Sequence, residues 1–102
     1  WNNLHAADVI ITTYGVVGSE FVHAGEGLGS LLYSFKYHRI VLDEAHYIKN
    51  GKARIARAAR KLDSQRRWCL TGTPIQNSLM DLHSLFQFLR VEPWDNVSWF
   101  NK

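Results

Sequence analysis

The sequence predicts an α/β fold in which helices flank a parallel sheet. Three short runs, residues 9–13, 40–42 and 68–71, consist almost entirely of apolar or β-branched residues and do not alternate strictly with polar ones. Runs of this kind are typical of strands covered on both faces, as in the parallel sheets of α/β domains. Two further segments repeat apolar residues every three or four positions, which is the period of an amphipathic helix.

The first helical segment spans residues 52–62 and has two chemically different faces. Its apolar positions are Ile55, Ala58, Ala59 and Leu62, and its basic positions are Arg54, Arg57, Arg60 and Lys61. A solvated basic face over an apolar stripe is the plainer interpretation of this pattern, and contact with a nucleic acid is the alternative.

The second helical segment spans residues 78–90. We expect its buried stripe to consist of Leu79, Leu82, Leu85, Phe86 and Leu89. Ser78, followed three positions later by Asp81, predicts an N-cap. Residues 18–30 contain four glycines and are predicted to form a loop. This loop is not a phosphate loop, because it lacks a suitably placed lysine and Glu26 would repel phosphate.

Length and composition limit the classes of protein that are possible. A chain of 102 residues fits at most one small domain, and 46% hydrophobic with 21% charged residues is ordinary globular composition. Cys69 is the only cysteine, which excludes an internal disulfide, and no apolar run approaches the ~20 residues of a membrane span. The net charge of +3 is compatible with a polyanionic partner. The chain begins with Trp1 and its only methionine is Met80, so we expect a fragment of a longer protein.

An acidic pair follows the second apolar run. Asp43 and Glu44 should lie at the carboxyl end of a buried strand, where open parallel sheets bind their ligands. Two adjacent carboxylates there repel each other, and a magnesium ion carrying nucleotide phosphates would compensate their charge. Asp43 would hold the metal, Glu44 would orient or deprotonate the attacking water, and His46 would hydrogen-bond to a neighbouring segment. Taken alone, the pair fits a surface turn equally well.

A second polar segment ends the third apolar run. Thr71, Gly72 and Thr73 precede Pro74, so two hydroxyl groups flank a glycine that permits unusual backbone angles. Such hydroxyls can relay hydrogen bonds between adjacent strand ends, although the segment by itself is simply a good turn.

Three segments together resemble a known family. In order, "DVIITTYGVV", "RIVLDEAHYIKN" and "RRWCLTGTPIQNSLMDLHSLFQFL" closely resemble the first motor lobe of Swi/Snf-type members of helicase superfamily two, over residues 8–89. The segments "YIKN" and "FLRVEPWDNVSWF" look most like the branch that contains helicase-like transcription factor and the postreplication-repair translocases. The resemblance implies an incomplete RecA-like sheet of the P-loop NTPase type, with residues 1–102 as the C-terminal part of the ATP-binding lobe.

The resemblance also implies roles for individual residues. Asp43 and Glu44 would be the magnesium-associated acid and the catalytic carboxylate of a DEAH box, which His46 would couple to the next motif. That coupling motif comprises Thr71, Gly72, Thr73, Gln76 and Asn77, and the segment along the bound DNA comprises Thr12, Thr13 and Tyr14. The implied cofactors are ATP and Mg²⁺. The implied partners are double-stranded DNA, free or in nucleosomes, and the second motor lobe of the same parent, in the nucleus and without a membrane.

The expected function is therefore part of a DNA-dependent ATPase that translocates along DNA in chromatin remodelling or repair. The phosphate loop and the arginines of the second lobe have no counterpart in these residues, and such an arginine contributes about 10³–10⁵ in rate. We therefore expect the chain alone not to hydrolyse ATP. The alternatives are a non-catalytic DNA-binding or protein-docking module, favoured by the basic segment 52–61, and a degenerate gene product, against which the intact Asp43 and Glu44 argue.

Overall fold

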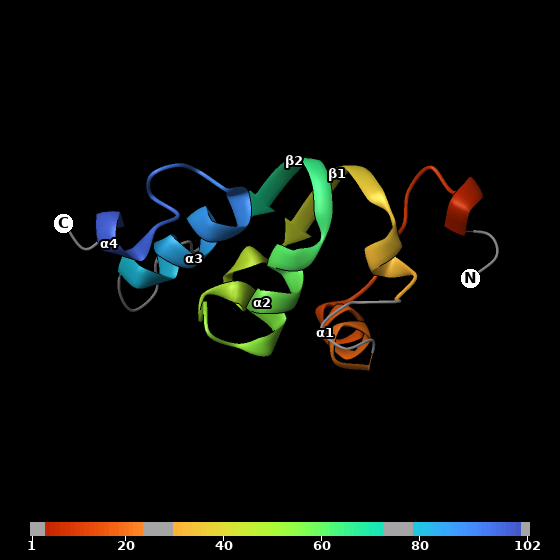
Figure 1. Ribbon diagram of the computed structural model, residues 1–102, viewed down its shortest axis with the longest axis horizontal. Helices are drawn as coiled ribbons and strands as arrows, with labels where there is room; N and C mark the ends of the chain where they lie inside the picture. The colour runs from red at the N-terminus through yellow and green to blue at the C-terminus, as the bar shows by residue number, and fades with distance from the viewer. Residues whose placement is uncertain (1–3, 24–29, 73–78, 101–102) are drawn as a thin grey trace.

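The computed structural model describes residues 4–23, 30–72 and 79–100. Its elements are η1 (Leu4–Ala6), α1 (Tyr14–His23), η2 (Leu32–Ser34), β1 (Lys36–Asp43), η3 (Ala45–Ile48), α2 (Arg54–Lys61), β2 (Asp63–Leu70), α3 (Leu79–Leu89) and α4 (Val97–Phe100), where η marks a 3-10 helix (Figure 1). No helix among these residues has the length and apolar character that a membrane crossing requires.

The two strands pair in parallel, as predicted. Their register runs from Lys36 opposite Asp63 to Asp43 opposite Leu70, and the chain passes from one strand to the other through η3 and α2. Because parallel strands point the same way, the carboxyl ends of β1 and β2 lie at one edge of the sheet. This arrangement confirms the α/β class.

One face of the sheet carries the core. Ile40 packs against both hydrophobic clusters, which draw most of their residues from α1, α2, α3, η2 and η3. On the opposite face Val41, Trp68 and Leu70 are exposed. The prediction of strands covered on both faces is therefore wrong for the described residues, because the packed helices all lie on the same side (Figure 1).

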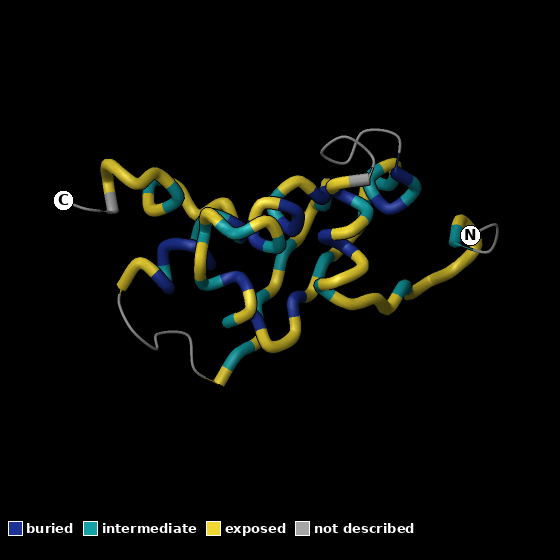
Figure 2. Tube along the Cα trace, turned by 90° about the horizontal axis from the view of Figure 1, so that it is seen from below, coloured by how far each residue is buried: buried dark blue, intermediate teal, exposed yellow. Residues whose placement is uncertain are grey.

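Residues 9–13 do not form the predicted strand. They lie outside any helix or strand and are mostly exposed (Figure 2), with Ile11 91% accessible. An apolar, β-branched run favours extended backbone, but a strand also requires a neighbouring strand for its ladder of hydrogen bonds. Among the described residues no strand lies beside this run.

Helix α1 occupies part of the segment that was predicted to be a loop. The Thr13 hydroxyl caps it by accepting a hydrogen bond from Val16 N–H at 3.1 Å, and the helix continues through Gly18 to His23. Gly18 faces α2, where an added Cβ would lie 3.6 Å from Ile55 Cγ1. Burial of Phe21 against α2 and its neighbours offsets the low helix propensity of glycine. Residues 24–29 of the predicted loop lie outside the described residues.

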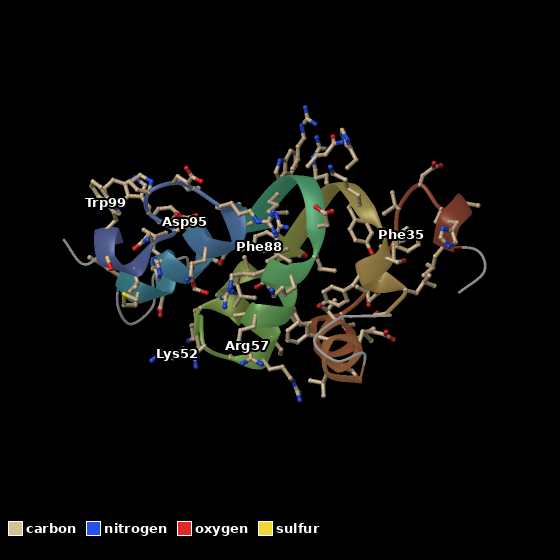
Figure 3. All side chains as sticks on the ribbon, viewed as in Figure 1. Phe35, Lys52, Arg57, Phe88, Asp95 and Trp99 are labelled. Atoms are coloured by element: carbon tan, nitrogen blue, oxygen red, sulfur yellow. The ribbon has the colours of Figure 1, made fainter. Side chains whose placement is uncertain are left out.

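Helix α2 confirms the predicted amphipathic helix. Of its predicted apolar face, Ala58, Ala59 and the following Leu62 are buried, together with Ala56. The basic side chains Arg54, Arg57 and Lys61 are exposed. Figure 3 shows Arg57 pointing away from the sheet, as does Lys52 just before the helix.

Helix α3 forms where it was predicted, and part of its predicted stripe packs inward: Leu85 is buried, and Leu82 and Leu89 pack against the core. The buried residues are Asp81, His83, Ser84, Leu85 and Phe88, whereas Leu79 is 64% exposed. Polar Ser84 is buried because its hydroxyl has a partner, the Ile48 carbonyl oxygen. Ser78, the predicted N-cap, lies outside the described residues.

Arg67 ties three elements together. Its guanidinium lies 4.8 Å from the centre of the fully buried Phe88 ring and donates to the backbone carbonyls of Leu62 and, at 3.4 Å, of Phe88. Burial, with a smaller contribution from nearby Arg90, lowers the pKa of Arg67 to about 10. The end of α2, β2 and α3 therefore meet around one cationic side chain.

Candidate active site

The carboxyl ends of the two strands form an edge that we call the carboxyl rim, comprising Asp43, Glu44, His46 and Thr71. Asp43 is the last residue of β1 and lies opposite Leu70, the last residue of β2, so Glu44 and Thr71 follow at the same edge. Asp43 and Glu44 are both exposed to solvent. The rim thus brings the two polar segments together, as the sequence predicted.

Glu44 adopts a backbone conformation that is uncommon for its residue type. Its φ of 50° and ψ of 51° lie in the left-handed region, which costs a non-glycine residue about 1–3 kcal/mol. The Glu44 N–H donates to Asp43 Oδ1 at 2.9 Å. The turn ends the strand abruptly and directs the Glu44 carboxylate over η3, with Oε2 3.6 Å from His46 Nδ1.

His46 lies between the two polar segments. Its Nδ1 is 3.4 Å from the Thr71 hydroxyl oxygen, a long hydrogen bond, and 3.6 Å from Glu44 Oε2. A protonated Nδ1 can donate to either oxygen, and an unprotonated one can accept from the Thr71 hydroxyl. One imidazole nitrogen is therefore shared between the acidic segment and the end of β2.

Helix η3 anchors the backbone of His46 to the hydrophobic core. Ala45 and Ile48 at its two ends are fully buried, and the Ile48 carbonyl accepts the hydrogen bond from Ser84 in α3. The two residues between them, His46 and Tyr47, remain accessible at the carboxyl rim. The backbone beneath these two side chains is thereby fixed to the core.

Tyr14 connects the predicted DNA-binding segment to the acidic pair. Its hydroxyl donates to the backbone carbonyl of Asp43 at 2.6 Å. Burial raises the pKa of Tyr14 to about 12, with smaller contributions from Cys69, Asp43 and Glu44. The phenol is therefore protonated at neutral pH and available as a donor. Thr12 and Thr13, just before it, are exposed.

Part of the predicted coupling motif can be located. Thr71 lies on the carboxyl rim, and Gly72 follows it; among the described residues other than its chain neighbours, no atom lies within 4 Å of where a Cβ would stand. Thr73, Gln76 and Asn77 lie outside the described residues, so their roles stay predictions.

The donor groups of the carboxyl rim fit a magnesium nucleotide better than a metal held by protein alone. The described part of the chain contains no group of three or more histidine, cysteine or acidic residues able to hold a metal. Magnesium bound with phosphates needs only one or two protein carboxylates, because water and phosphate fill the other positions. The exposed Asp43, at a strand end beside Thr71, offers one such ligand.

Sequence reasoning gave no role to Tyr47. Its ring centre lies 5.2 Å from that of Tyr14 and 5.2 Å from that of His46. An exposed tyrosine next to the acidic motif was the available signal, but contact with Tyr14, 33 positions earlier, requires the fold.

Comparison with known proteins gives consistent matches. The family model for the SNF2-related domain matches residues 2–102. The DNA repair protein RAD5A of Arabidopsis thaliana is 56% identical over 99 residues, which are 97% of this chain and 10% of that protein. The DNA repair protein rad8 of Schizosaccharomyces pombe is 47% identical over 92 residues, 90% of this chain and 8% of that protein.

A solved structure is also similar. The structure of the Sulfolobus solfataricus SWI2/SNF2 ATPase core in complex with dsDNA superposes with a TM-score of 0.69 and 38% identity, over 84% of this chain and 16% of that one. These matches confirm the predicted resemblance, including the DNA-repair branch, and the partial RecA-like fold. This chain spans about a tenth of the length of the repair proteins.

Proposed function

This chain belongs to the SNF2-related domain family, and from that premise we propose that it is part of the ATP-binding lobe of a DNA-dependent ATPase. Residues 1–102 form the C-terminal part of that lobe, and the parent protein supplies the phosphate loop and the second lobe. The observation that carries the proposal is the carboxyl rim, where His46 links Glu44 to Thr71. The parent acts on double-stranded DNA, free or in nucleosomes, in repair or remodelling in the nucleus.

The carboxyl rim divides the chemistry between its two acids. Bound Mg²⁺ and ATP supply a neutralised, polarised terminal phosphate. Asp43 would hold the metal, directly or through water. Glu44, whose carboxylate lies over η3 beside His46, orients and deprotonates the attacking water. His46 limits the positions that the Glu44 carboxylate can take. Because the same imidazole nitrogen contacts the Thr71 hydroxyl, a movement of Thr71 alters those positions.

The DNA contact is assigned to the segment that leads into α1. Thr12 and Thr13 are exposed, and the Thr13 oxygen that caps the helix still carries a proton to donate. Hydroxyls and free backbone amides of this kind contact DNA phosphates and position a protein without reading the base sequence. The similar Sulfolobus ATPase core was solved in complex with dsDNA, which supports this assignment.

The test is Glu44→Gln in the parent protein. The change keeps the size and left-handed backbone position of the side chain but removes its basicity. ATP binding should be preserved, while DNA-stimulated hydrolysis should fall about 10²–10⁴-fold, the usual contribution of a general base. Glu92→Gln, at an exposed position after α3, is the matched control and should leave the rate unchanged. Hydrolysis near the original rate in the Glu44 variant would show that Glu44 is not the base.

A second candidate function, a non-catalytic DNA-binding or docking module, is favoured by the basic face of α2. A surface hollow of about 220 Å³ is lined by Phe21, Arg57, Arg60 and Lys61. No acidic residue occurs within α2, and burial together with Arg57 lowers the pKa of Arg60. A bound anion would relieve this concentration of positive charge.

Salt dependence separates the two functions. In the parent, neutralising Arg57 and Lys61 to glutamine would reduce the slope of log affinity against log salt by about two if both contact phosphates. The module is favoured if that change abolishes DNA binding and Glu44→Gln has no effect on the rate. The ATPase is favoured if DNA binding survives the change of Arg57 and Lys61 and Glu44→Gln lowers the rate of hydrolysis.

A further inference from the structure

Tyr47 is an exposed ring that two other rings hold in place. Its centre is 5.2 Å from Tyr14, at an interplanar angle of 31°, and 5.2 Å from His46, at 22°. Both separations lie within the range of offset-stacked pairs. The residue is nevertheless 61% exposed, so burial of the ring does not explain its position. The ring is placed by its two neighbours.

Both neighbours are tied to the carboxyl rim. At one end, the Tyr14 hydroxyl donates to the Asp43 carbonyl at 2.6 Å. At the other end, His46 Nδ1 lies 3.6 Å from Glu44 Oε2. A displacement of Tyr14 can therefore reach Glu44 by two routes, along the backbone from Asp43 and across the ring of Tyr47 to His46.

The backbone beneath the stack is fixed. Ala45 and Ile48 are fully buried on either side of His46 and Tyr47, whose own side chains remain accessible to solvent. Tyr14 begins α1 directly after the exposed Thr12 and Thr13. The stacked rings thus join the solvent-exposed segment before α1 to His46, which lies beside Glu44.

We propose that Tyr47 is a positioning residue that couples DNA contact at the Tyr14 segment to the placement of His46 and Glu44. The inference rests on the proposed function, since it requires that DNA binds near Thr12 and Thr13 and that nucleotide binds at the carboxyl rim. Tyr47 touches neither ligand in this scheme. Its effect is on the coupling between the two sites and not on the affinity of either site alone.

Coupling of this kind is measurable as a ratio of dissociation constants. The Kd of the full-length parent for a DNA duplex is measured with and without a non-hydrolysable ATP analogue, and the ratio is the coupling factor, typically about 5- to 150-fold. In Tyr47→Ala this factor should fall by about two- to tenfold, the equivalent of one aromatic pair. The Kd for DNA alone and the Kd for nucleotide alone should stay within about twofold of the parent values.

Two variants give the test its controls. Tyr47→Phe keeps the ring, and no hydrogen bond of the Tyr47 hydroxyl occurs within the described segments, so the coupling factor should be retained. Trp94→Ala removes another exposed aromatic ring, in the segment between α3 and α4, and should also leave the factor unchanged.

Several results would overturn the inference. An unchanged coupling factor in Tyr47→Ala would remove the coupling role, and equal weakening of both separate affinities would indicate a structural role. If Tyr47→Leu behaves like the parent, side-chain bulk and not stacking is responsible. A parent that binds both ligands with no coupling overturns the inference and leaves the assignment of Glu44 intact. A parent that binds no nucleotide contradicts the proposed function itself.

Discussion

Replacing Ser84 with alanine should loosen the segment that carries His46 and Tyr47, although Ser84 lies in α3. Ser84 is 1% exposed, and its hydroxyl donates to the carbonyl of fully buried Ile48, the last residue of η3. Alanine preserves α3, because it has the highest helix propensity, but it deprives the Ile48 carbonyl of this donor. Leaving a buried acceptor without its partner costs about 1–3 kcal/mol.

The effect should appear as local unfolding of η3. With RT near 0.59 kcal/mol, a loss of about 1–3 kcal/mol increases the open population by roughly 5- to 150-fold. Hydrogen–deuterium exchange of the parent protein, followed by mass spectrometry on peptides that cover residues 44–50, measures this population. The amides of these peptides should exchange faster by that factor in Ser84→Ala, while peptides from β1 should change less.

Ser34→Ala is a control of the same chemistry. The Ser34 hydroxyl donates to the Leu31 carbonyl at 2.6 Å, but Ser34 is exposed, so water can replace the donor. Exchange around residue 34 should therefore change by no more than about twofold. If residues 44–50 exchange at the parent rate in a correctly folded Ser84→Ala variant, the hydrogen bond does not secure η3 and the reasoning fails.

Three further predictions concern the stability of the lobe. Phe88→Ala should lower its free energy of unfolding by about 3–5 kcal/mol and Phe88→Leu by much less, because Phe88 is fully buried; equal urea midpoints for the two variants would contradict this. Arg67→Lys should lower it by about 1–3 kcal/mol, since lysine cannot reproduce the planar contacts with two carbonyls and a ring; an unchanged thermal midpoint would argue against that role. Burial, with smaller effects of Tyr37 and Glu20, raises the pKa of Tyr33 to about 12. The stabilisation that the neutral Tyr33 side chain contributes to the folded state is therefore complete below pH 10 and is lost as the pH rises from about 10 to 12. Tyr33→Phe should make the midpoint less dependent on pH over that interval, and a decline as steep as that of the parent would refute the assignment.

The confirmed parts of the fold have strong local signals. The apolar residues 40–42 lie within β1 and residues 68–70 within β2, and each pairs with a strand that the same chain supplies. Helix α2 was predicted from its period because alanine, arginine and lysine all favour a helix, and its apolar and basic residues separate onto two faces.

The failures arise where tertiary context decides the outcome. Residues 9–13 resemble a strand in composition, but strand pairing depends on a neighbour that no local pattern reveals. Residues 18–23, the first part of the predicted loop, are helical because Phe21 and Gly18 pack on α2. On α3 the predicted Leu85 is buried, but the burial of Ser84 was missed because serine counts as polar in the sequence and its partner, the Ile48 carbonyl, is a backbone group.

The candidate site was partly predictable for the same reason. That Asp43 and Thr71 share one edge follows from two parallel strands, and the motifs marked both strand ends. The left-handed backbone of Glu44 is uncommon for a residue other than glycine, so the residue type gives no signal of it. The stacking of Tyr47 between Tyr14 and His46 depends on distances between segments. Only the folded chain supplies these distances.

The central claim is that Asp43 and Glu44 face a magnesium nucleotide at the carboxyl rim. A crystal structure of the parent with Mg²⁺ and a non-hydrolysable ATP analogue tests it most directly. The metal should lie about 2.0–2.1 Å from an Asp43 carboxylate oxygen, or one bound water away, with the terminal phosphate on the side of Glu44. A nucleotide bound at another edge of the sheet, with its metal beyond the reach of Asp43, would contradict the account.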